Sequence, residues 1–130
     1  MIAAVPIAVS LAAPASATAD PAPPFIDHAT WVDFDGPAGL RVYPTVAGRV
    51  AASQLTKPIW EADEAWDEVL MLAPGADTAG MRAQFVCHWR FAEIAEPGKT
   101  SWNLEPWRPV VDDLAMVDAG CNPGGGEEPS

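Results

Sequence analysis

Two histidines, His28 and His88, are the side chains of this chain best suited to acid–base chemistry near neutral pH. Paired with a carboxylate from Asp27, Asp33 or Asp35, either imidazole could form a hydrolytic or divalent-metal site. Asp33 and Asp35 would share one face if their segment is a strand. No H-E-x-x-H, G-x-S-x-G or calcium-loop motif accompanies these residues. The sequence therefore favours a half-buried structural His88 and surface aspartates, and it predicts neither a metal nor a cofactor.

A Trp-rich segment, residues 99–109, carries the second pattern of functional interest. Its side chains of the types that contact sugars or peptides are Trp102, Asn103, Glu105, Trp107 and Arg108. Prolines at positions 106 and 109 would stiffen the loop and lower the entropy lost on binding. The alternative is that both indoles fold back to complete a small core. Because Trp107 lies between the two prolines, we expect it to be partly exposed and Trp102 to be buried.

The N-terminal region has the layout of an export signal. Residues 2–13 are almost wholly apolar and uncharged, and two overlapping A-x-A patterns follow at residues 15–19. The apolar stretch is shorter than the roughly 18 residues that a membrane span needs, although an uncleaved anchor is the alternative. No Lys or Arg precedes it, so the basic start of a signal would lie upstream. We expect residues 1–19 to be a signal peptide, and the mature chain to be secreted without a membrane span.

Cys87 and Cys121 are the two cysteines of the chain. In an oxidising compartment such a pair is more often a disulfide than a metal site. Closing this loop would stabilise the fold by about 3–4 kcal/mol. A nucleophilic Cys87–His88 pair is the alternative, but sequence neighbours on a helix do not face each other. The sequence predicts a Cys87–Cys121 disulfide.

The charge balance limits the kinds of partner. The chain of 130 residues has 18 Asp and Glu against 7 Lys and Arg, a net charge of −11. Nonspecific nucleic-acid binding needs Lys and Arg to displace phosphate counterions, and an anionic membrane surface needs them for attraction. We therefore expect no nucleic-acid partner and an extracellular or cell-envelope ligand, either protein or glycan.

Hydrophobic periodicity and turn signals predict the elements that position these residues. A Pro-rich spacer at residues 20–24 precedes two short runs of β-type residues, 30–34 and 40–43, which predict a hairpin. Helices are expected at residues 45–53, from a Thr56 cap to residue 73, from residue 77 or 78 to residue 97, and at residues 109–119.

The same periodicity assigns side chains to the core or to the surface. The side chains expected in the core are Ile59, Met81, Phe85, Trp89, Ala92, Val110, Leu114 and Val117 of the helices, and Trp31 and Trp66. The acidic side chains expected on a solvated helix face are Glu61, Asp63, Glu64, Asp67 and Glu68. These elements predict a small single α+β domain at residues 25–121. It consists of an N-terminal β-hairpin packed on three or four helices, with one disulfide. Residues 122–130 are expected to be a disordered tail.

Several strings in the second half of the chain resemble a known family. They are CHWRFA from Cys87, EPGK from Glu96, SWNLEPWRP from Ser101 and GCNPGG from Gly120, with LRVYPT from Leu40 as a similar front end. Together they resemble the secreted bacterial domain of unknown function 2599 over most of residues 25–125. The resemblance implies secretion and a shared fold, and it implies no activity, substrate or catalytic residue.

Two classes of function fit these observations. The first is a noncatalytic secreted binding or interaction module that uses the Trp-rich segment. The second is a small secreted hydrolase or toxin-like enzyme that uses His88 or His28 with nearby carboxylates. The absence of a recognised nucleophile motif favours the first. Convergence of His28, His88 and Glu105 in one pocket would favour the second.

Overall fold

A three-stranded antiparallel sheet forms one layer of the molecule. The computed structural model describes residues 3–6, 20–33 and 36–125. The strands are β1 (Ile26–Asp33), β2 (Ala38–Pro44) and β3 (Trp102–Leu104), in the order β1-β2-β3. Leu40 and Val42 of β2 are fully buried while Arg41 between them is not, as the alternation of a strand requires. The predicted hairpin is confirmed, and the sheet gains a third strand from the segment expected to be a loop.

Four α-helices and one short 3₁₀ helix complete the α+β fold. They are α1 (Val46–Ser53), α2 (Ile59–Leu72), the 3₁₀ helix η1 (Pro74–Ala76), α3 (Ala79–Ala95) and α4 (Asp113–Asp118). Thr45 caps α1 by accepting a hydrogen bond from Gly48 N, and Thr78 caps α3 by accepting one from Met81 N. The expected Thr56 cap is wrong, because Pro58 directly precedes α2 and gives it no side-chain cap.

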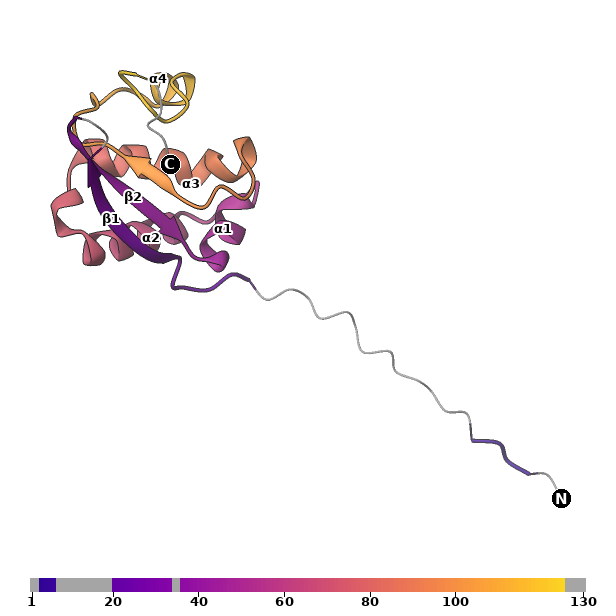
Figure 1. Ribbon diagram of the computed structural model, residues 1–130. Helices are drawn as coiled ribbons and strands as arrows, with labels where there is room; N and C mark the ends of the chain where they lie inside the picture. The colour runs from indigo at the N-terminus through magenta and orange to yellow at the C-terminus, as the bar shows by residue number, and fades with distance from the viewer. Residues whose placement is uncertain (1–2, 7–19, 34–35, 126–130) are drawn as a thin grey trace.

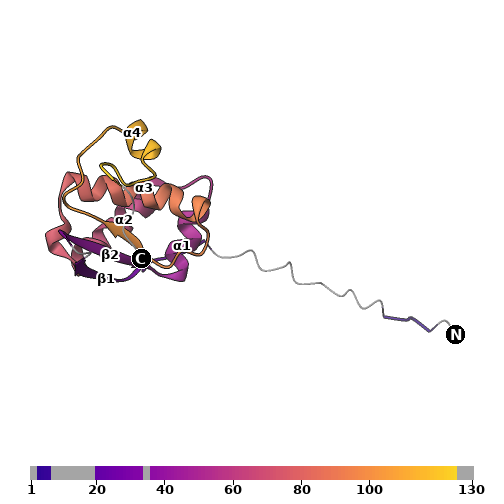
Figure 2. The same ribbon diagram turned by 45° about the horizontal axis from the view of Figure 1, so that its top comes forward.

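The helices cover one face of the sheet and then extend away from it. In Figures 1 and 2, α3 crosses the sheet, and α4 lies on the side of α3 away from the strands. Helix α2 packs against β1, and α3 packs against β3, α1 and α2. Helix α3 is thus the central element of the molecule, with neighbours on several sides.

The core lies between α3 and the sheet and is rich in aromatic rings. The apolar stripe of Met81, Phe85 and Trp89 on α3 is buried, as its spacing predicted. Trp102 of β3 joins it, with ring centroids 5.9 Å from Phe85 and 6.3 Å, edge to face, from Trp89. Trp66 is also buried, but Trp31 is 42 % exposed because it lies on the edge strand β1.

A glycine in α1 allows two segments to approach closely. A Cβ atom at Gly48 would lie 2.1 Å from the carbonyl oxygen of Phe25. The same carbonyl accepts a hydrogen bond from Thr45 N at 2.8 Å. The start of the sheet is therefore held against the first turn of α1, and a larger residue at position 48 would separate them.

The C-terminal helix differs most from its prediction. It spans Asp113–Asp118 rather than residues 109–119. Val110, Leu114 and Val117, which were expected to face inward, are 68 %, 72 % and 46 % exposed, and Met116 is buried instead. The predicted disulfide joins Cys87 to Cys121 with 5.5 Å between their Cα atoms. This bond and Met116 together turn the opposite face of α4 toward α3.

The two ends of the chain are described only in part. The predicted signal peptide, residues 1–19, lies largely outside the described residues, as do residues 126–130 of the predicted tail. Asn122 and Pro123, at the start of that tail, are buried against the domain. Within the described part of the chain, no helix has the length and apolar character needed to cross a membrane.

Candidate functional site

A buried ion pair organises the Trp-rich segment. A turn in which Arg108 N donates to Glu105 O at 3.2 Å brings the two side chains together. Arg108 Nη2 then donates to Glu105 Oε1 at 3.1 Å, and both side chains are almost fully buried. Such a pair compensates for its desolvation only when further hydrogen bonds satisfy it.

Backbone carbonyl groups near the C-terminus supply those further bonds. Arg108 Nη1 donates to the carbonyl oxygens of Asn122, Pro123 and Gly125 at 3.0, 3.2 and 2.9 Å. One guanidinium group thus holds residues 122–125 against the Trp-rich segment. Contacts with the domain therefore continue past Cys121.

Gln84 of α3 fixes the other side of the segment. Its Nε2 donates to the carbonyl oxygen of Glu105 at 2.9 Å, and its Oε1 accepts from Glu105 N at 2.8 Å. Asn103 is buried next to this contact, and its Oδ1 accepts from Arg41 Nε at 3.3 Å. The backbone of the segment is thereby joined to α3 through Gln84, and the Asn103 side chain joins it to β2.

Four of the five candidate binding residues are consequently internal. Trp102, Asn103 and Glu105 have no exposed surface, and Arg108 is 3 % exposed. Polar residues in a proline-rich segment are ordinarily found at the surface, so their types alone gave no signal of this burial. A signal was available in the pairing of Glu105 with Arg108 three positions later.

Trp107 is the exposed member of the predicted set. Its side chain is 41 % exposed, and the guanidinium carbon of Arg108 lies 4.4 Å from the ring centroid. Gly124 and Gly125 lie against the ring, because a Cβ at either position would be 3.7 Å from it. Gly124 also has a φ of +89°, which favours glycine. The ring therefore rests on a fixed surface and presents its remaining area to solvent.

The two histidines lie in different surroundings. His28 is exposed on β1, where its Nδ1 contacts Asp27 Oδ2 and its ring stacks on Tyr43 at 4.0 Å. His88 is buried in α3, and its Nδ1 donates to the carbonyl oxygen of Gln84 at 2.8 Å. Its ring is stacked at 6.2 Å from Trp102. His88 is thus more deeply buried than the half-buried position expected from the sequence.

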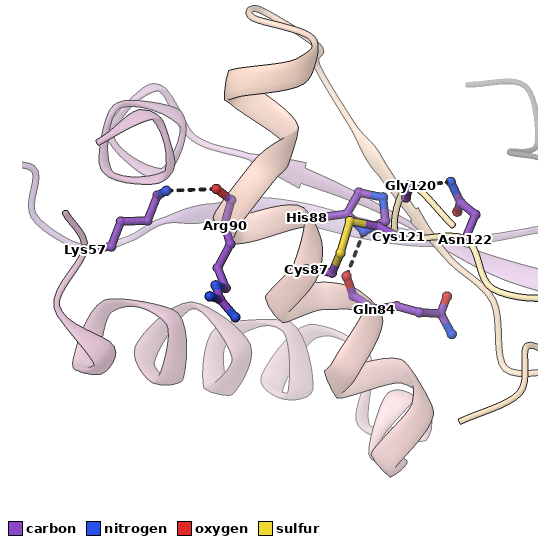
Figure 3. The surroundings of a disulfide bond; sticks show 8 residues. All are labelled: Lys57, Gln84, Cys87, His88, Arg90, Gly120, Cys121 and Asn122. Carbon is purple, nitrogen blue, oxygen red and sulfur yellow. Dashed lines mark hydrogen bonds between the residues drawn. A yellow bond between two sulfur atoms is a disulfide. The ribbon is translucent and has the colours of Figure 1, made fainter. Parts of the chain in front are cut away.

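A small cavity lies beside the disulfide. It has a volume of about 260 Å³ and is lined by His88, Phe91, Lys99, Val117 and Cys121 among others. Figure 3 shows His88 on the same side of α3 as Cys121 and Asn122. Neither His28 nor Glu105 lines this cavity. The three residues whose convergence would have favoured an enzyme do not meet there.

The described residues offer no site for a metal ion. No group of three or more His, Cys, Asp or Glu side chains among residues 3–6, 20–33 and 36–125 is arranged to hold one. Asp33 is exposed at the end of β1, and Asp35 lies outside the described residues. The carboxylates considered from the sequence therefore form no ligand set with either histidine in the described part of the chain.

Two glutamates of α2 depart from the expected solvated face. Glu68 Oε1 accepts hydrogen bonds from Phe25 N at 2.8 Å and Ile26 N at 2.9 Å, which holds the start of β1 to α2. Burial raises the pKa of Glu68, and the neighbouring Glu64 adds to this rise. Glu61 is only 5 % exposed, and burial raises its pKa, with a smaller contribution from the charge of Asp20.

A groove between α2 and α3 was missed by the sequence analysis. It has a volume of about 510 Å³, and the α3 residues Arg82, Val86, Arg90 and Ile94 line it. These residues recur every four positions and form a second stripe beside the core stripe. That spacing was the available signal, although two of the four residues are arginines, which are ordinarily exposed.

Comparison with known proteins gives a family and no function. The family of proteins of unknown function DUF2599 matches residues 26–124. The chain belongs to the DUF2599 family. Uncharacterized proteins of Mycobacterium tuberculosis and Mycobacterium bovis are each 58 % identical to it over 106 residues, covering 82 % of this chain and 70 % of theirs. An uncharacterized protein of Mycobacterium leprae is 50 % identical over 101 residues, covering 78 % of this chain and 80 % of its own.

The extent of the DUF2599 match agrees with the structure. It begins at the first residue of β1 and ends at Gly124, within the segment that Arg108 holds. No solved structure matches the chain. The Glu105–Arg108 pair and the residues it fixes are therefore part of the DUF2599 domain.

Proposed function

We propose that this DUF2599 chain is a secreted, noncatalytic binding domain that contacts its ligand through Trp107. The observation that carries the proposal is the half-exposed indole of Trp107, backed by the Arg108 guanidinium and by the glycines at 124 and 125. A large aromatic side chain that is already fixed loses little entropy when it binds. Rigid Trp side chains of this kind dominate the energy of many recognition surfaces.

The chemistry of the ligand follows from the indole and the charge of the chain. An exposed indole face packs against the C–H face of a sugar ring or against apolar and cationic side chains of a protein. The net charge of −11 disfavours nucleic acids and anionic lipid surfaces. A cell-envelope glycan or protein is therefore the proposed ligand, and the N-terminal A-x-A pattern supports secretion.

The test uses a second tryptophan as a matched control. Trp31 is 42 % exposed, almost the same as the 41 % of Trp107, but it lies on β1. The full chain would be applied to an array of envelope oligosaccharides and to fractionated envelope proteins, as wild type, Trp107→Ala and Trp31→Ala. We expect Trp107→Ala to weaken binding by about 2 kcal/mol or more without lowering the unfolding midpoint substantially. Equal losses in both variants, or binding unaffected by Trp107→Ala, would refute this role.

The hydrolase alternative has weaker support. One of the histidine–carboxylate pairs that it requires is present, between His28 and Asp27. This pair is exposed on β1 and lies outside the cavity and the groove described above. A His88→Ala variant distinguishes a structural from a catalytic role of His88. We expect a lower unfolding midpoint from loss of a buried ring, rather than loss of a specific activity in a stable protein.

A further inference from the structure

The groove between α2 and α3 concentrates positive charge in an acidic protein. Lys57, Arg82 and Arg90 line it, three of the seven basic residues of the chain. Asp63 is the acidic residue among its lining side chains, and its Oδ1 accepts from Arg82 Nη2 at 2.8 Å. The groove therefore has an excess of positive charge, whereas the whole chain has a net charge of −11.

One of these cations, Lys57, is held against the backbone of α3 at Arg90 and has no acidic partner among the groove residues. Lys57 Nζ donates to the backbone carbonyl oxygen of Arg90 at 2.9 Å, as Figure 3 shows. Burial and the charge of Arg90 lower the pKa of Lys57. An anionic group placed in the groove would relieve this repulsion.

The groove also exposes large apolar side chains. Leu55, Ile59 and Ile94 line it and are 89 %, 81 % and 49 % exposed. From Arg82 to Ile94 the α3 wall extends over about 18 Å, at 1.5 Å per residue. A ligand with apolar groups and acidic groups spread along its length matches this surface better than one with a single charged end.

Helix α4 and the three residues before it carry the complementary chemistry. Leu114 and Val117 lie three positions apart on α4 and are exposed, and Val110, in the non-helical segment before α4, is exposed as well. The charged residues of this stretch, residues 110–118, are Asp112, Asp113 and Asp118, and all three are exposed. The stretch therefore has three negative charges, no positive charge and exposed apolar side chains that no other described residue of this chain covers.

Helix α4 cannot enter the groove of its own chain. The Cys87–Cys121 disulfide holds the C-terminal end of α4 to α3. A separate groove between α3 and α4 is lined by Arg82, Val86 and Arg90, which also line the α2/α3 groove. These shared residues form a ridge with α2 on one side and α4 on the other.

We propose that the α2/α3 groove of one copy receives α4 of a second copy of this chain. Because groove and helix flank the same ridge, a two-fold axis near α3 would form both contacts at once, in a closed dimer. Leu114 and Val117 of α4 then cover Leu55, Ile59 and Ile94, and the aspartates of the stretch lie among the groove cations. This surface is separate from Trp107 and does not depend on the proposed function.

The first measurement is the mass of the full, oxidised chain by sedimentation equilibrium from about 1 to about 200 µM, a range over which mass action populates a weak dimer. We expect the average mass to rise from that of one chain to that of two. A monomer at every concentration would overturn the proposal, including the case in which the groove instead binds an acidic amphipathic peptide from another protein.

Variants then test which surfaces form the dimer. Ile59→Asp places a negative charge in the groove, and Leu114→Asp removes the central apolar contact of α4. We expect each to weaken the dimer by about 30-fold or more, the effect of losing a hot-spot side chain. Met71→Asp is the control, since Met71 is 84 % exposed on α2 but does not line the groove. Circular dichroism and an intact disulfide would verify the fold of each variant.

Mixing the two damaged variants gives the decisive result. The Leu114→Asp chain keeps its groove, and the Ile59→Asp chain keeps its α4, so an equimolar mixture can form one intact contact. We expect the mixture to dimerise more strongly than either variant alone. A dimer that ignores both substitutions, or a mixture no stronger than its components, would show that groove and α4 do not meet.

Discussion

The Trp-rich segment and helix α4 both lie close to the disulfide, yet their exposure is the opposite of what their residue types predict. The segment buries polar side chains, and α4 exposes apolar ones. The polar residues Asn103, Glu105 and Arg108 of the segment are buried, whereas the apolar residues Leu114 and Val117 of α4 are exposed. The difference shows that residue type predicts burial poorly where polar groups find hydrogen-bond partners inside the protein. It also shows that a short helix can be oriented by one covalent bond against its own apolar stripe.

The two regions are held in place by different means. The polar segment is tied by many bonds: Gln84 binds the backbone of Glu105, and Arg108 binds a carboxylate and three carbonyl groups. Helix α4 is held mainly by the disulfide and by Met116, which packs with Cys87 and Cys121. We therefore expect the segment to lose its structure only when its central ion pair is broken. We expect α4 to become more mobile when the disulfide is removed.

The largest expected effect comes from Arg108→Met. Loss of the guanidinium leaves a buried Glu105 carboxylate and frees the carbonyl groups of residues 122–125. Breaking a buried pair in this way costs about 3–5 kcal/mol of unfolding free energy, measurable by urea denaturation. Arg82→Met is the matched control, because its ion pair with Asp63 is half-exposed and is worth about 0.2–1 kcal/mol.

A double variant sharpens this prediction. Adding Glu105→Gln to Arg108→Met removes the unpaired carboxylate, so the double variant should be more stable than Arg108→Met alone. If Arg108→Met and Arg82→Met lower the free energy of unfolding by equal amounts, the buried ion pair does not organise the segment.

The second effect in size comes from removing the disulfide with paired Cys87→Ala and Cys121→Ala substitutions. We expect a loss of about 2–5 kcal/mol in unfolding free energy. Amide hydrogen exchange should become faster throughout α4, while the amides of β3 and Glu105 keep most of their protection because Gln84 and Arg108 remain. Equal loosening of both regions would contradict the idea that they are held by separate means.

Much of the fold was accessible from local patterns in the sequence. The α3 stripe, the start of α3, the hairpin and the disulfide depend on neighbours along the chain or on the cysteine count, and all are present. Strand β3 was missed because three residues gain strand geometry only by pairing with Leu40–Val42, about sixty positions away. The inward face of α4 was wrong for a similar reason, since the disulfide rather than the helical period sets its orientation.

In the candidate site, too, features set by neighbouring residues could be predicted, and features set by distant contacts could not. The expected burial of Trp102 and exposure of Trp107 are both observed, because the flanking prolines act locally. The spacing of Glu105 and Arg108 was a signal of their pairing, but their burial also depends on Gln84 and on carbonyl groups after Cys121, which are distant along the chain. The spacing on α3 indicates one wall of the α2/α3 groove, but the groove itself depends on the relative placement of two helices, which no local pattern gives.

The smallest expected effect concerns Glu61, a carboxylate of α2 that is buried without the pairing that Glu105 has. Its pKa is raised in the folded chain, so the folded state binds more protons than the unfolded state between the ordinary pKa and the raised one. Stability therefore falls as pH rises through this window, and the penalty is complete at neutral pH. Glu61→Gln should raise the thermal midpoint slightly at pH 7 and leave it unchanged below the ordinary pKa of about 4.5. Asp67→Asn removes one charge from the exposed side of the same helix and measures the contribution of net charge alone. A Glu61→Gln gain that matches the Asp67→Asn gain at every pH would show that general repulsion, and not burial, accounts for it.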